Sequence, residues 1–507
     1  MHITDENKRH RPSLTEYRHG VKAPLYDCLS MTLAERLQTV DLSKLDQVSK
    51  VYFKYTWGLD GSGEHSNYNQ LTKVHYTTKQ VVSVCFAVKE MTVEDSQGVR
   101  IVWNSSVKGA NKPQNVRPLA LFPAKEEKEL LEDFVPKVEA EIKKINTEGI
   151  ELKIKDGTTV TANCEKSSLS MADGKMVTTL LQLGGSYCTM CTQSQAQCHN
   201  PSVIEKGFTI DRSIESLKEL ALSLADPDTG DIVKEKGDYQ TRKGVCDHPI
   251  TETDLTKNIP VCHAKIRAFE WSIELITREL SHKKWWCVSK PVKYTTEEKD
   301  EYKLVREHIK KELFEKLAVN IGNPGDMVTG NAFQAFSSDH ARDTICNLVD
   351  EHIREELREI HLGLSAAVKV INSQKRKVNI DKLRELTKEV NLRIVNTFPW
   401  AVISPSVHRI LAHSWERIQL NDGFGLGDES EEGLEALNKW IRKLRVGGAR
   451  KTSTEDNFTD TFNHLWDRSR PIIVEMERVI KRKKQKVMIE TEIESLVNSL
   501  FLEDNQN

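Results

Sequence analysis

Two cysteines separated by two residues, Cys188 and Cys191 in the run CTMC, are the first chemical signal in the sequence. Two thiolates on one tight turn span one edge of a tetrahedron, which makes this spacing half of a typical structural zinc site. The other half has several candidates: His408 and His413 in HRILAH, or Cys198, His199, Cys246, His248, Cys262 and His263. An i, i+5 pair such as His408 and His413 does not share one face of an α-helix, so its use requires a distorted or terminal turn. Spacing alone favours surface or core histidines, and the ligand set stays open.

A carboxylate at the end of a predicted strand is a second candidate. Asp60 lies in GLDGSGEHS, directly after the strand pattern VYFKYTW. Beside flexible glycines at a strand terminus, a carboxylate can face a divalent metal ion and a phosphate. The alternative is a turn aspartate that serves local backbone hydrogen bonds. Because the chain has 75 Asp+Glu, composition singles out no catalytic carboxylate.

Two basic runs are candidates for contact with nucleic acid: RKLRVGGARK at 442–451 and IKRKKQK at 480–486. Clustered Lys and Arg neutralise backbone phosphates. For 442–451 we favour DNA contact over a solvated helix face, whereas for 480–486 a nuclear-import signal is an equal alternative.

The elements that would position these residues change character along the chain. Residues 1–48 are polar, with one expected helix in MTLAERLQTVDL, and we predict an arm or small docking element. From Val51, alternating patterns predict a β-meander made of VYFKYTW, KQVVSVCFAVKEMTV, VRIVW and RPLALF. A helical run, AKEEKELLEDFVPKVEAEIKKI, and the short strands IELKI and TTVTA follow, as in α/β or α+β domains.

Beyond about residue 205 the pattern is almost wholly helical. Apolar residues recur at i, i+3/i+4 and i+7 in segments that begin at Cys262, Asp300, Thr344, Ile380 and Glu431. These segments are predicted to be core-facing helices. The Gly/Asp-rich stretch 224–244 between them is predicted to be an exposed loop.

The whole chain sets broader limits. At ~100–200 residues per domain, 507 residues predict three or four packed units. A formal charge of −2 excludes a uniformly basic nucleic-acid binder but not local basic stripes. The sequence has no apolar run near the ~18 residues of a membrane span and no signal-peptide core in its polar start, so we expect a soluble intracellular protein. Its ten scattered cysteines favour reduced thiols and metal binding over disulfides.

Five sequence blocks give the most specific signal. They are YFKYTWGLDGSGEHS, RPLALFPAKEEKE, MADGKMVTTLLQLGGSYCTMC, SVHRILAHSWERI and NDGFGLGDESEEGLEALNKWIRK. In their order and approximate spacing they resemble the Transib family of DNA transposases, and also the catalytic core of the V(D)J recombinase, which is related to that family. The resemblance runs from about residue 50 to residue 470.

This resemblance implies a catalytic triad of Asp60, Asp173 and Glu435. The placement of Glu435 is anchored by Asn438 and Lys439, which match the Asn-Lys after the family's glutamate. In a different register, Glu432 would take the place of Glu435.

An additional acidic position of the family matches Glu126 in PAKEEKE. The neighbouring Glu127 is its rival, because both lie in a run of Glu and Lys. Apart from the resemblance, Glu126 can be an ordinary first-turn carboxylate that the helix dipole favours.

The family's zinc ligands match Cys188, Cys191, His408 and His413. Because all four positions are filled by protein, the implied zinc is structural. A wholly local site from Cys188, Cys191, Cys198 and His199 remains the alternative.

The implied fold class is α/β: an RNase H-like catalytic fold with a large, mostly helical, zinc-binding insertion. The expected domains are an N-terminal arm, the first part of the catalytic domain, the insertion, and the catalytic Glu helix with a helical tail. They span residues 1–48, 49–185, 186–425 and 426–507.

The implied function is cut-and-paste DNA transposition with two Mg²⁺ (or Mn²⁺) ions per active site. The resemblance implies nicking at element ends, hairpins on the flanking DNA and joining of 3′ ends to target DNA. The expected partners are double-stranded DNA, as terminal inverted repeats and target, and a second copy of the chain; the expected location is the nucleus. The competing hypotheses are a domesticated recombinase subunit with the same chemistry and a catalytically inactive, zinc-stabilised DNA-binding protein.

Overall fold

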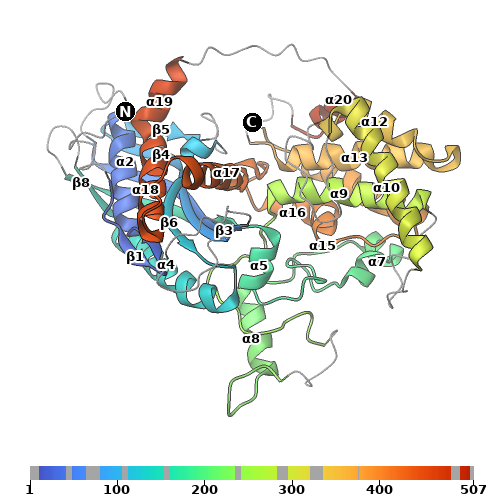
Figure 1. Cartoon of the computed structure of the whole chain (residues 1–507), viewed down its shortest axis with the longest axis horizontal. Helices are drawn as coiled ribbons and strands as arrows, with labels where there is room; N and C mark the ends of the chain where they lie inside the picture. Colours follow the sequence, from blue (N-terminus) through green and yellow to red (C-terminus); the bar gives the residue numbers. More distant parts are fainter. Residues whose placement is uncertain are drawn as a thin grey trace. The chain divides into compact units, whose positions relative to one another are not determined.

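The chain forms two compact units in this computed structural model (Figure 1). Unit 1 comprises 1–180, 249–254 and 428–485, and unit 2 comprises 181–248, 255–427 and 486–507. The structure describes residues 11–40, 48–63, 80–105, 112–153, 159–233, 241–281, 295–319, 335–374, 376–480 and 492–502. Both units are therefore made of segments that are distant in the sequence.

Unit 1 is built on an eight-stranded mixed sheet. Its order is β1-β2-β6-β4-β3-β8-β7, and β5 pairs with β4. The strands are β1 (Thr15–Tyr17), β2 (Gly20–Lys22), β3 (Lys50–Ser62), β4 (Val81–Asp95), β5 (Gly98–Asn104), β6 (Arg117–Pro123), β7 (Ile150–Lys153) and β8 (Thr159–Met171). Large apolar side chains of the central strands, such as Trp57, Phe86 and Phe122, are fully buried in its core.

The sheet is not the simple meander predicted from the alternating patterns. Strands β3, β4 and β5 do follow one another antiparallel, but β6 then returns to β4 and β8 runs parallel beside β3. The length of β4 explains the return, because one end of it pairs with β6 and the other end pairs with β5. As a result β3, β6 and β8 all run in the same direction and end at one edge of the sheet.

Helices of unit 1 contact this sheet: α4 packs on β8, α17 on β3, and α18 on β2 and β6. The helices are α2 (Leu25–Gln38), α4 (Lys128–Glu148), α5 (Gly174–Leu180), α17 (Glu432–Gly447), α18 (Thr454–Arg468), α19 (Pro471–Ile480) and the 3₁₀ turn η2 (Pro113–Asn115). The short return at 249–254 is held by Glu139, whose Oε1 accepts hydrogen bonds from the Thr251 and Thr253 hydroxyls.

The N-terminal residues differ from the expected arm. Strands β1 and β2 extend the sheet of unit 1, and α2 spans Leu25–Gln38 rather than the predicted 31–42. Leu25, Leu29, Leu33 and Leu37 recur every four residues and are all buried, so the helix has its own contact with unit 1.

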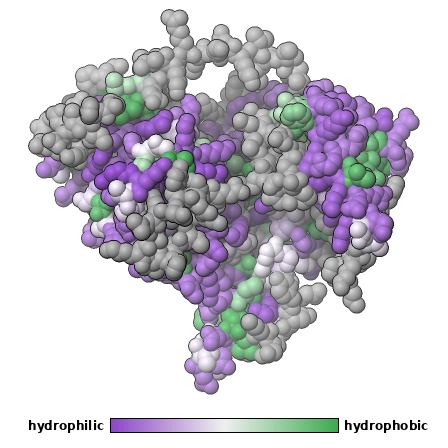
Figure 2. All heavy atoms as spheres, viewed as in Figure 1, coloured by the Kyte–Doolittle hydropathy of each residue, from purple (hydrophilic) through white to green (hydrophobic). Residues whose placement is uncertain are grey.

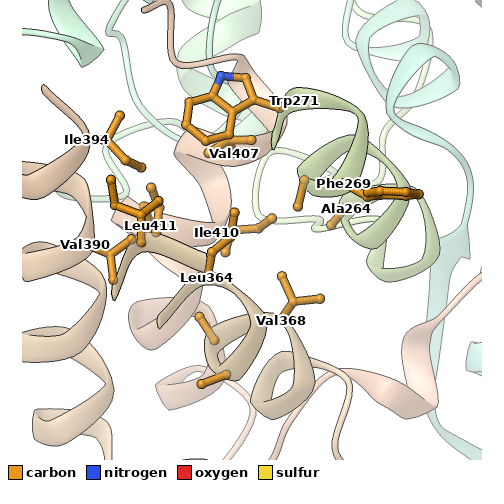
Figure 3. Packing of buried hydrophobic residues seen from close by; sticks show 14 of the residues in the cluster. Ala264, Phe269, Trp271, Leu364, Val368, Val390, Ile394, Val407, Ile410 and Leu411 are labelled. Atoms are coloured by element: carbon orange, nitrogen blue, oxygen red, sulfur yellow. The ribbon is translucent and has the colours of Figure 1, made fainter. Parts of the chain in front are cut away.

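Unit 2 is helical. Its elements are α6 (Gln195–Cys198), α7 (Pro201–Lys206), α8 (Ile214–Leu224), α9 (Val261–Leu280), α10 (Thr296–Leu317), α12 (Asp339–Cys346), α13 (Glu351–Ile371), α14 (Ile380–Thr397), α15 (Pro405–His408), the π-helix η3 (Arg409–His413), α16 (Ser414–Gln419) and α20 (Glu492–Ser499); a 3₁₀ turn, η4 (Gly427–Glu429), follows α16. Figure 3 shows side chains of α9, α13, α14, α15 and η3 converging in its core.

One predicted helix of unit 2 is two helices. The periodic segment that begins at Thr344 is interrupted at Asn347–Asp350, between α12 and α13. Asn and Asp side chains compete for backbone hydrogen bonds and favour helix ends, which explains a break that apolar periodicity alone does not reveal.

On the face drawn in Figure 2, hydrophobic residues gather in small areas. Figure 2 shows a face that is largely hydrophilic where it is coloured. Within the described residues, no helix is long and apolar enough to cross a membrane.

Candidate active site and metal centre

Asp60 and Asp173 lie at the same level on neighbouring strands. Asp60 is inside β3, which runs on to Ser62 instead of ending before it as predicted, and Asp173 lies just beyond the end of β8. The parallel register of β3 and β8 pairs Gly58 with Met171, and each aspartate lies two residues beyond its member of that pair. Adjacent strands lie about 4.8 Å apart, so the two carboxylates start from close backbone positions. A Cβ at position 58 would lie 1.9 Å from the Met171 carbonyl oxygen, so this approach requires glycine.

Asp173 sits at the start of helix α5. Its Oδ1 accepts a hydrogen bond from the Met176 backbone N–H at 2.5 Å. A carboxylate in this place is stabilised by the unpaired N–H groups and the positive end of the helix dipole. The aspartate is thereby fixed in direction where β8 ends.

Glu126 joins the same edge from the third parallel strand, β6. Its Oε1 accepts the Gly61 N–H at 2.5 Å, and its Oε2 lies 3.2 Å from Lys175 Nζ. Burial raises the pKa of Glu126 and the charge of Asp173 raises it further, while Gly61 and Lys175 oppose the shift. Its rival Glu127 is exposed and precedes the first turn of α4, so the structure brings Glu126, and not Glu127, to Asp60.

Helix α17 reaches this edge through Asn438. Asn438 Nδ2 donates to Asp60 Oδ2 at 2.5 Å, and Ser83 Oγ donates to Asn438 Oδ1 at 2.7 Å. Glu435 lies one helical turn before Asn438, and side chains at i and i+3 are neighbours on a helix surface. Glu432 lies at the first position of the helix, two turns from Asn438. The contact between α17 and Asp60 therefore favours Glu435 over Glu432.

The carboxylates do not crowd around one point. Within the described residues, the oxygens of Asp60, Asp173 and Glu435 do not form a set whose members all lie within 4.8 Å of one another. Ligands of a single small cation, bound at about 2.1 Å, would be closer than that. In this structure the three carboxylates are therefore not arranged as ligands of one common ion.

The basic run 442–451 is only partly available for DNA. Arg445 is buried, where it donates to Asn457 Oδ1 and lies 4.5 Å from the centre of the Phe458 ring; burial lowers its pKa to about 10. Arg450 forms ion pairs with Asp456 and Asp460. Both arginines thus have contacts inside unit 1. Nearly all of the second run, 481–486, lies outside the described residues.

Unit 2 brings together the four residues matched to zinc ligands. Cys188, Cys191, His408 and His413 are all buried, and one ligand atom from each lies within 4.8 Å of all the others. The Cys191 Sγ lies 3.4 Å from His408 Nε2. Two ligands of a tetrahedral zinc, with bonds of about 2.3 Å to S and 2.0–2.1 Å to N, would be about 3.6 Å apart, so this separation fits a metal between them.

The i, i+5 spacing of the histidines is explained by a π-helix. Residues 409–413 form the single π turn η3 between α15 and α16. A π turn closes i to i+5, so His408 and His413 come to lie one turn apart on one face. The sequence predicted a distorted turn here, and the structure has one. Ile410 and Leu411 of the same turn are buried in the core (Figure 3).

Polar atoms of these histidines have no hydrogen-bond partner, although they are buried. They are His408 Nδ1 and both ring nitrogens of His413. Buried polar atoms usually find partners. Each ring can give a metal ion one nitrogen, so one of the His413 nitrogens could be a ligand, whereas His408 would bind through Nε2, the nitrogen that faces Cys191. The Glu416 carboxylate lies 3.5 Å from His413 Nδ1 and is placed to orient that ring.

The rival ligands are not in this group. Cys198 is buried nearby but lies outside the four-residue cluster, and His199 Nε2 is 2.7 Å from the Pro399 carbonyl oxygen. Hydrogen bonds to Cys191 and His408 lower the pKa of the Cys188 thiol, against the effect of its burial.

Sequence reasoning did not identify Ser83 and Lys175 as site residues and used Asn438 only as an alignment anchor. Ser83 is the cross-strand partner of Asp60 in the β3–β4 register. That register was the only signal from which Ser83 could have been found, and it depends on the strand pairing.

The comparison with protein families agrees with this geometry. Residues 55–186 match the family model described as the RNase H domain of recombination-activation protein 1 (RAG1). The match relates this region, which contains most of β3, the strands β4 to β8 and the residues Asp60, Glu126 and Asp173, to the catalytic core of the V(D)J recombinase. The mixed sheet with its helices fits an RNase H-like domain. No curated protein shows a significant match to the chain.

Proposed function

We propose that this protein is a cut-and-paste DNA transposase of the Transib type. It would nick at element ends, form hairpins on the flanking DNA and join the 3′ ends to target DNA. The observation that carries the proposal is the meeting of Asp60, Glu126 and Asp173 at one edge of an RNase H-like sheet, with the Glu435 helix hydrogen-bonded to that edge.

The residues at this edge fit divalent cations such as Mg²⁺ or Mn²⁺. Carboxylate oxygens are the hard ligands that these ions prefer. The negative charge of Asp173 contributes to the raised pKa of Glu126, so the carboxylates repel one another and a cation would relieve that repulsion. Two ions held by Asp60, Asp173 and Glu435 would activate the attacking oxygen and stabilise the leaving oxygen.

The protein's own contribution is to hold these carboxylates in fixed directions. The Gly61 N–H and Lys175 hold Glu126, the first turn of α5 holds Asp173, and Asn438 holds Asp60. Preorganised ligands avoid reorganisation during the reaction. Lys175 is largely exposed and can also approach a DNA phosphate.

For unit 2 we propose a structural zinc ion held by Cys188, Cys191, His408 and His413. The Cys₂His₂ donor set, its burial and the 3.4 Å separation of Cys191 Sγ and His408 Nε2 support this. Four protein ligands leave no open position, so the zinc would stabilise unit 2 and take no part in DNA cutting.

The proposal extends to double-stranded DNA as substrate, a homodimer as the working form and the nucleus as the location. The family match concerns a recombinase domain, so a domesticated recombinase subunit with the same chemistry is the second candidate. Terminal inverted repeats that flank the gene would indicate the transposase, because a domesticated gene no longer needs them.

A metal-dependent nicking assay on DNA with paired element ends tests this function. The parent protein should nick only with Mg²⁺ or Mn²⁺, and Asp173→Asn should abolish nicking while DNA binding is kept. Asp133→Asn is a matched control, since Asp133 on α4 instead bonds Tyr17 and Lys137. Nicking without a divalent ion, or an active Asp173→Asn variant, would show that the proposal is wrong.

A further inference from the structure

We propose that Asn438 and Ser83 form a positioning pair that sets the direction of the Asp60 carboxylate for metal binding, a role that rests on the proposed function. Asn438 Nδ2 donates to Asp60 Oδ2 at 2.5 Å, and Ser83 Oγ donates to Asn438 Oδ1 at 2.7 Å. Both side chains are buried. They act through Asp60 and are positioning residues, not catalytic ones.

The pair fixes the rotation of the Asp60 carboxylate about its terminal side-chain torsion, which Asp60 alone would leave free. The terminal torsion of an aspartate is broad, so an unsupported carboxylate turns easily. Asn438 holds Oδ2 and so sets which lone pairs of Asp60 face a cation. Residues that hydrogen-bond a metal ligand orient it in this way and are commonly needed for full metal affinity.

Ser83 gives the amide of Asn438 its direction. Because the Ser83 hydroxyl donates to Oδ1, the Nδ2 group of Asn438 is the one that faces Asp60. Ser83 is itself placed by the sheet, since it is the cross-strand partner of Asp60. The series of hydrogen bonds therefore runs from β4 through α17 to β3.

The same series of hydrogen bonds also links two of the proposed metal ligands. Asn438 and Glu435 lie one turn apart on α17, so the bond to Asp60 holds the helix that presents Glu435. Loss of the bond is expected to disturb Asp60 and Glu435 together.

If the role of the pair were purely structural, the experiment would give a different result. Unit 1 contains a matched control for this comparison. Thr56 on β3 and Ser170 on β8 are both buried, and their hydroxyl oxygens lie 2.5 Å apart. Ser170→Ala removes a buried hydrogen bond from the same sheet without contact to Asp60. It measures the effect of a lost buried hydrogen bond alone.

The test is a Mn²⁺-binding titration followed by electron paramagnetic resonance. The full-length parent, Asn438→Ala, Ser83→Ala and Ser170→Ala are compared, with melting curves and the Mg²⁺ midpoint of nicking measured beside them. Asn438→Ala should bind Mn²⁺ about 10–100-fold more weakly, the range typical for residues that orient metal ligands. Ser83→Ala should show a smaller loss, and Ser170→Ala should keep the parental affinity although it melts earlier.

A folded Asn438→Ala protein with the Mn²⁺ affinity of Ser170→Ala would overturn this role. If Asn438→Ala does not fold, the same criterion applies to the milder Ser83→Ala variant. If the proposed function itself is wrong, the result is different. The parent and Asp60→Asn would then bind Mn²⁺ equally, and the positioning role would also be wrong.

Discussion

At the scale of single residues, each proposed carboxylate at the sheet edge has a partner from another element. The Asp60 carboxylate bonds a helix side chain, Asp173 caps a helix, and Glu126 accepts a strand N–H. These partners restrict rotation, which leaves the oxygens directed before any metal or DNA arrives. Single substitutions can therefore separate metal binding from DNA binding.

Replacing Glu435 or Glu432 with its amide, glutamine, tests which of the two is the catalytic glutamate. Glu435→Gln should lose nicking, hairpin formation and strand transfer together, because one site performs every step. Glu432→Gln should nick at close to the parental rate. Gel-shift affinity for the element ends should be kept in both, because phosphate contacts come from Lys and Arg.

The reverse result, an active Glu435→Gln and an inactive Glu432→Gln, would move the catalytic glutamate one helical turn toward the start of α17. Activity in both variants would contradict the triad itself.

Because His361 is buried, we predict a loss of folding stability in mild acid. It is buried in unit 2, and burial, with a smaller effect of Arg342, lowers its pKa from 6.5 to about 3. Because the unfolded chain binds the proton more readily, the stabilising contribution is complete above pH 6.5 and declines as the pH falls toward 3. One pH unit below 6.5 the loss should be about 1.4 kcal/mol.

Urea unfolding at about pH 7.5 and about pH 5.5 measures this loss. The parent should lose more stability between the two values than His361→Gln, which cannot titrate. Equal losses would mean that His361 is not held neutral by its surroundings.

At the scale of elements, much of the arrangement could be predicted from the sequence. Alternation predicted the positions of β3 to β7, and apolar spacing predicted α9, α14 and α17. For β8 it predicted only TTVTA, which ends at Ala162, whereas the strand runs on to Met171. The return of β6 to β4 and the parallel pairing of β8 with β3 could not be predicted, because strand pairing depends on distant contacts that periodicity does not record. The carboxylates other than Asp60 were predicted through a family resemblance, and their mutual hydrogen bonds were not predicted.

The π turn η3 is the element on which the zinc proposal depends most. Cys188→Ser should release the metal, because a thiolate is a far better ligand than a hydroxyl. It should also lower the melting temperature by more than about 5 °C, since binding energy at a structural site is folding energy. Elemental analysis and thermal melting check both effects.

Cys198→Ser is the matched control, because Cys198 is also buried but lies outside the cluster. A Cys188→Ser protein that keeps its zinc and melts like the parent would contradict the ligand assignment.

The exposed lysines of helix α17 lead to a prediction about DNA contact. Lys439 and Lys443 are exposed on this helix, four residues apart, whereas Arg450 is engaged by Asp456 and Asp460. Replacing both lysines with Ala should weaken binding and reduce the slope of log affinity against log salt by about 2. Arg450→Ala should leave that slope unchanged. Equal slopes for all three proteins would remove α17 from the DNA interface.

At the scale of the whole molecule, two units are interleaved along one chain. Unit 1 is completed by residues 428–485, which follow most of unit 2 in the sequence. The proposed chemistry needs one active site for each DNA end, so a single chain cannot cut and insert two ends in concert.

A symmetric dimer is therefore the expected working form. Mass measurement of the complex on paired element ends should give two protein chains, with both ends cut in the same particle. An active complex with one chain would contradict this expectation.

The late position of α17 has a consequence for the growing polypeptide. Asp60, Glu126 and Asp173 are synthesised early, but Glu435 and Asn438 leave the ribosome only after the intervening segments of unit 2. A nascent chain, or a gene copy that carries a premature stop before codon 428, would have the sheet edge without its helix. Under the proposed function, such a truncated chain would lack Glu435 and could not cut DNA, so cutting would begin only when translation is nearly finished.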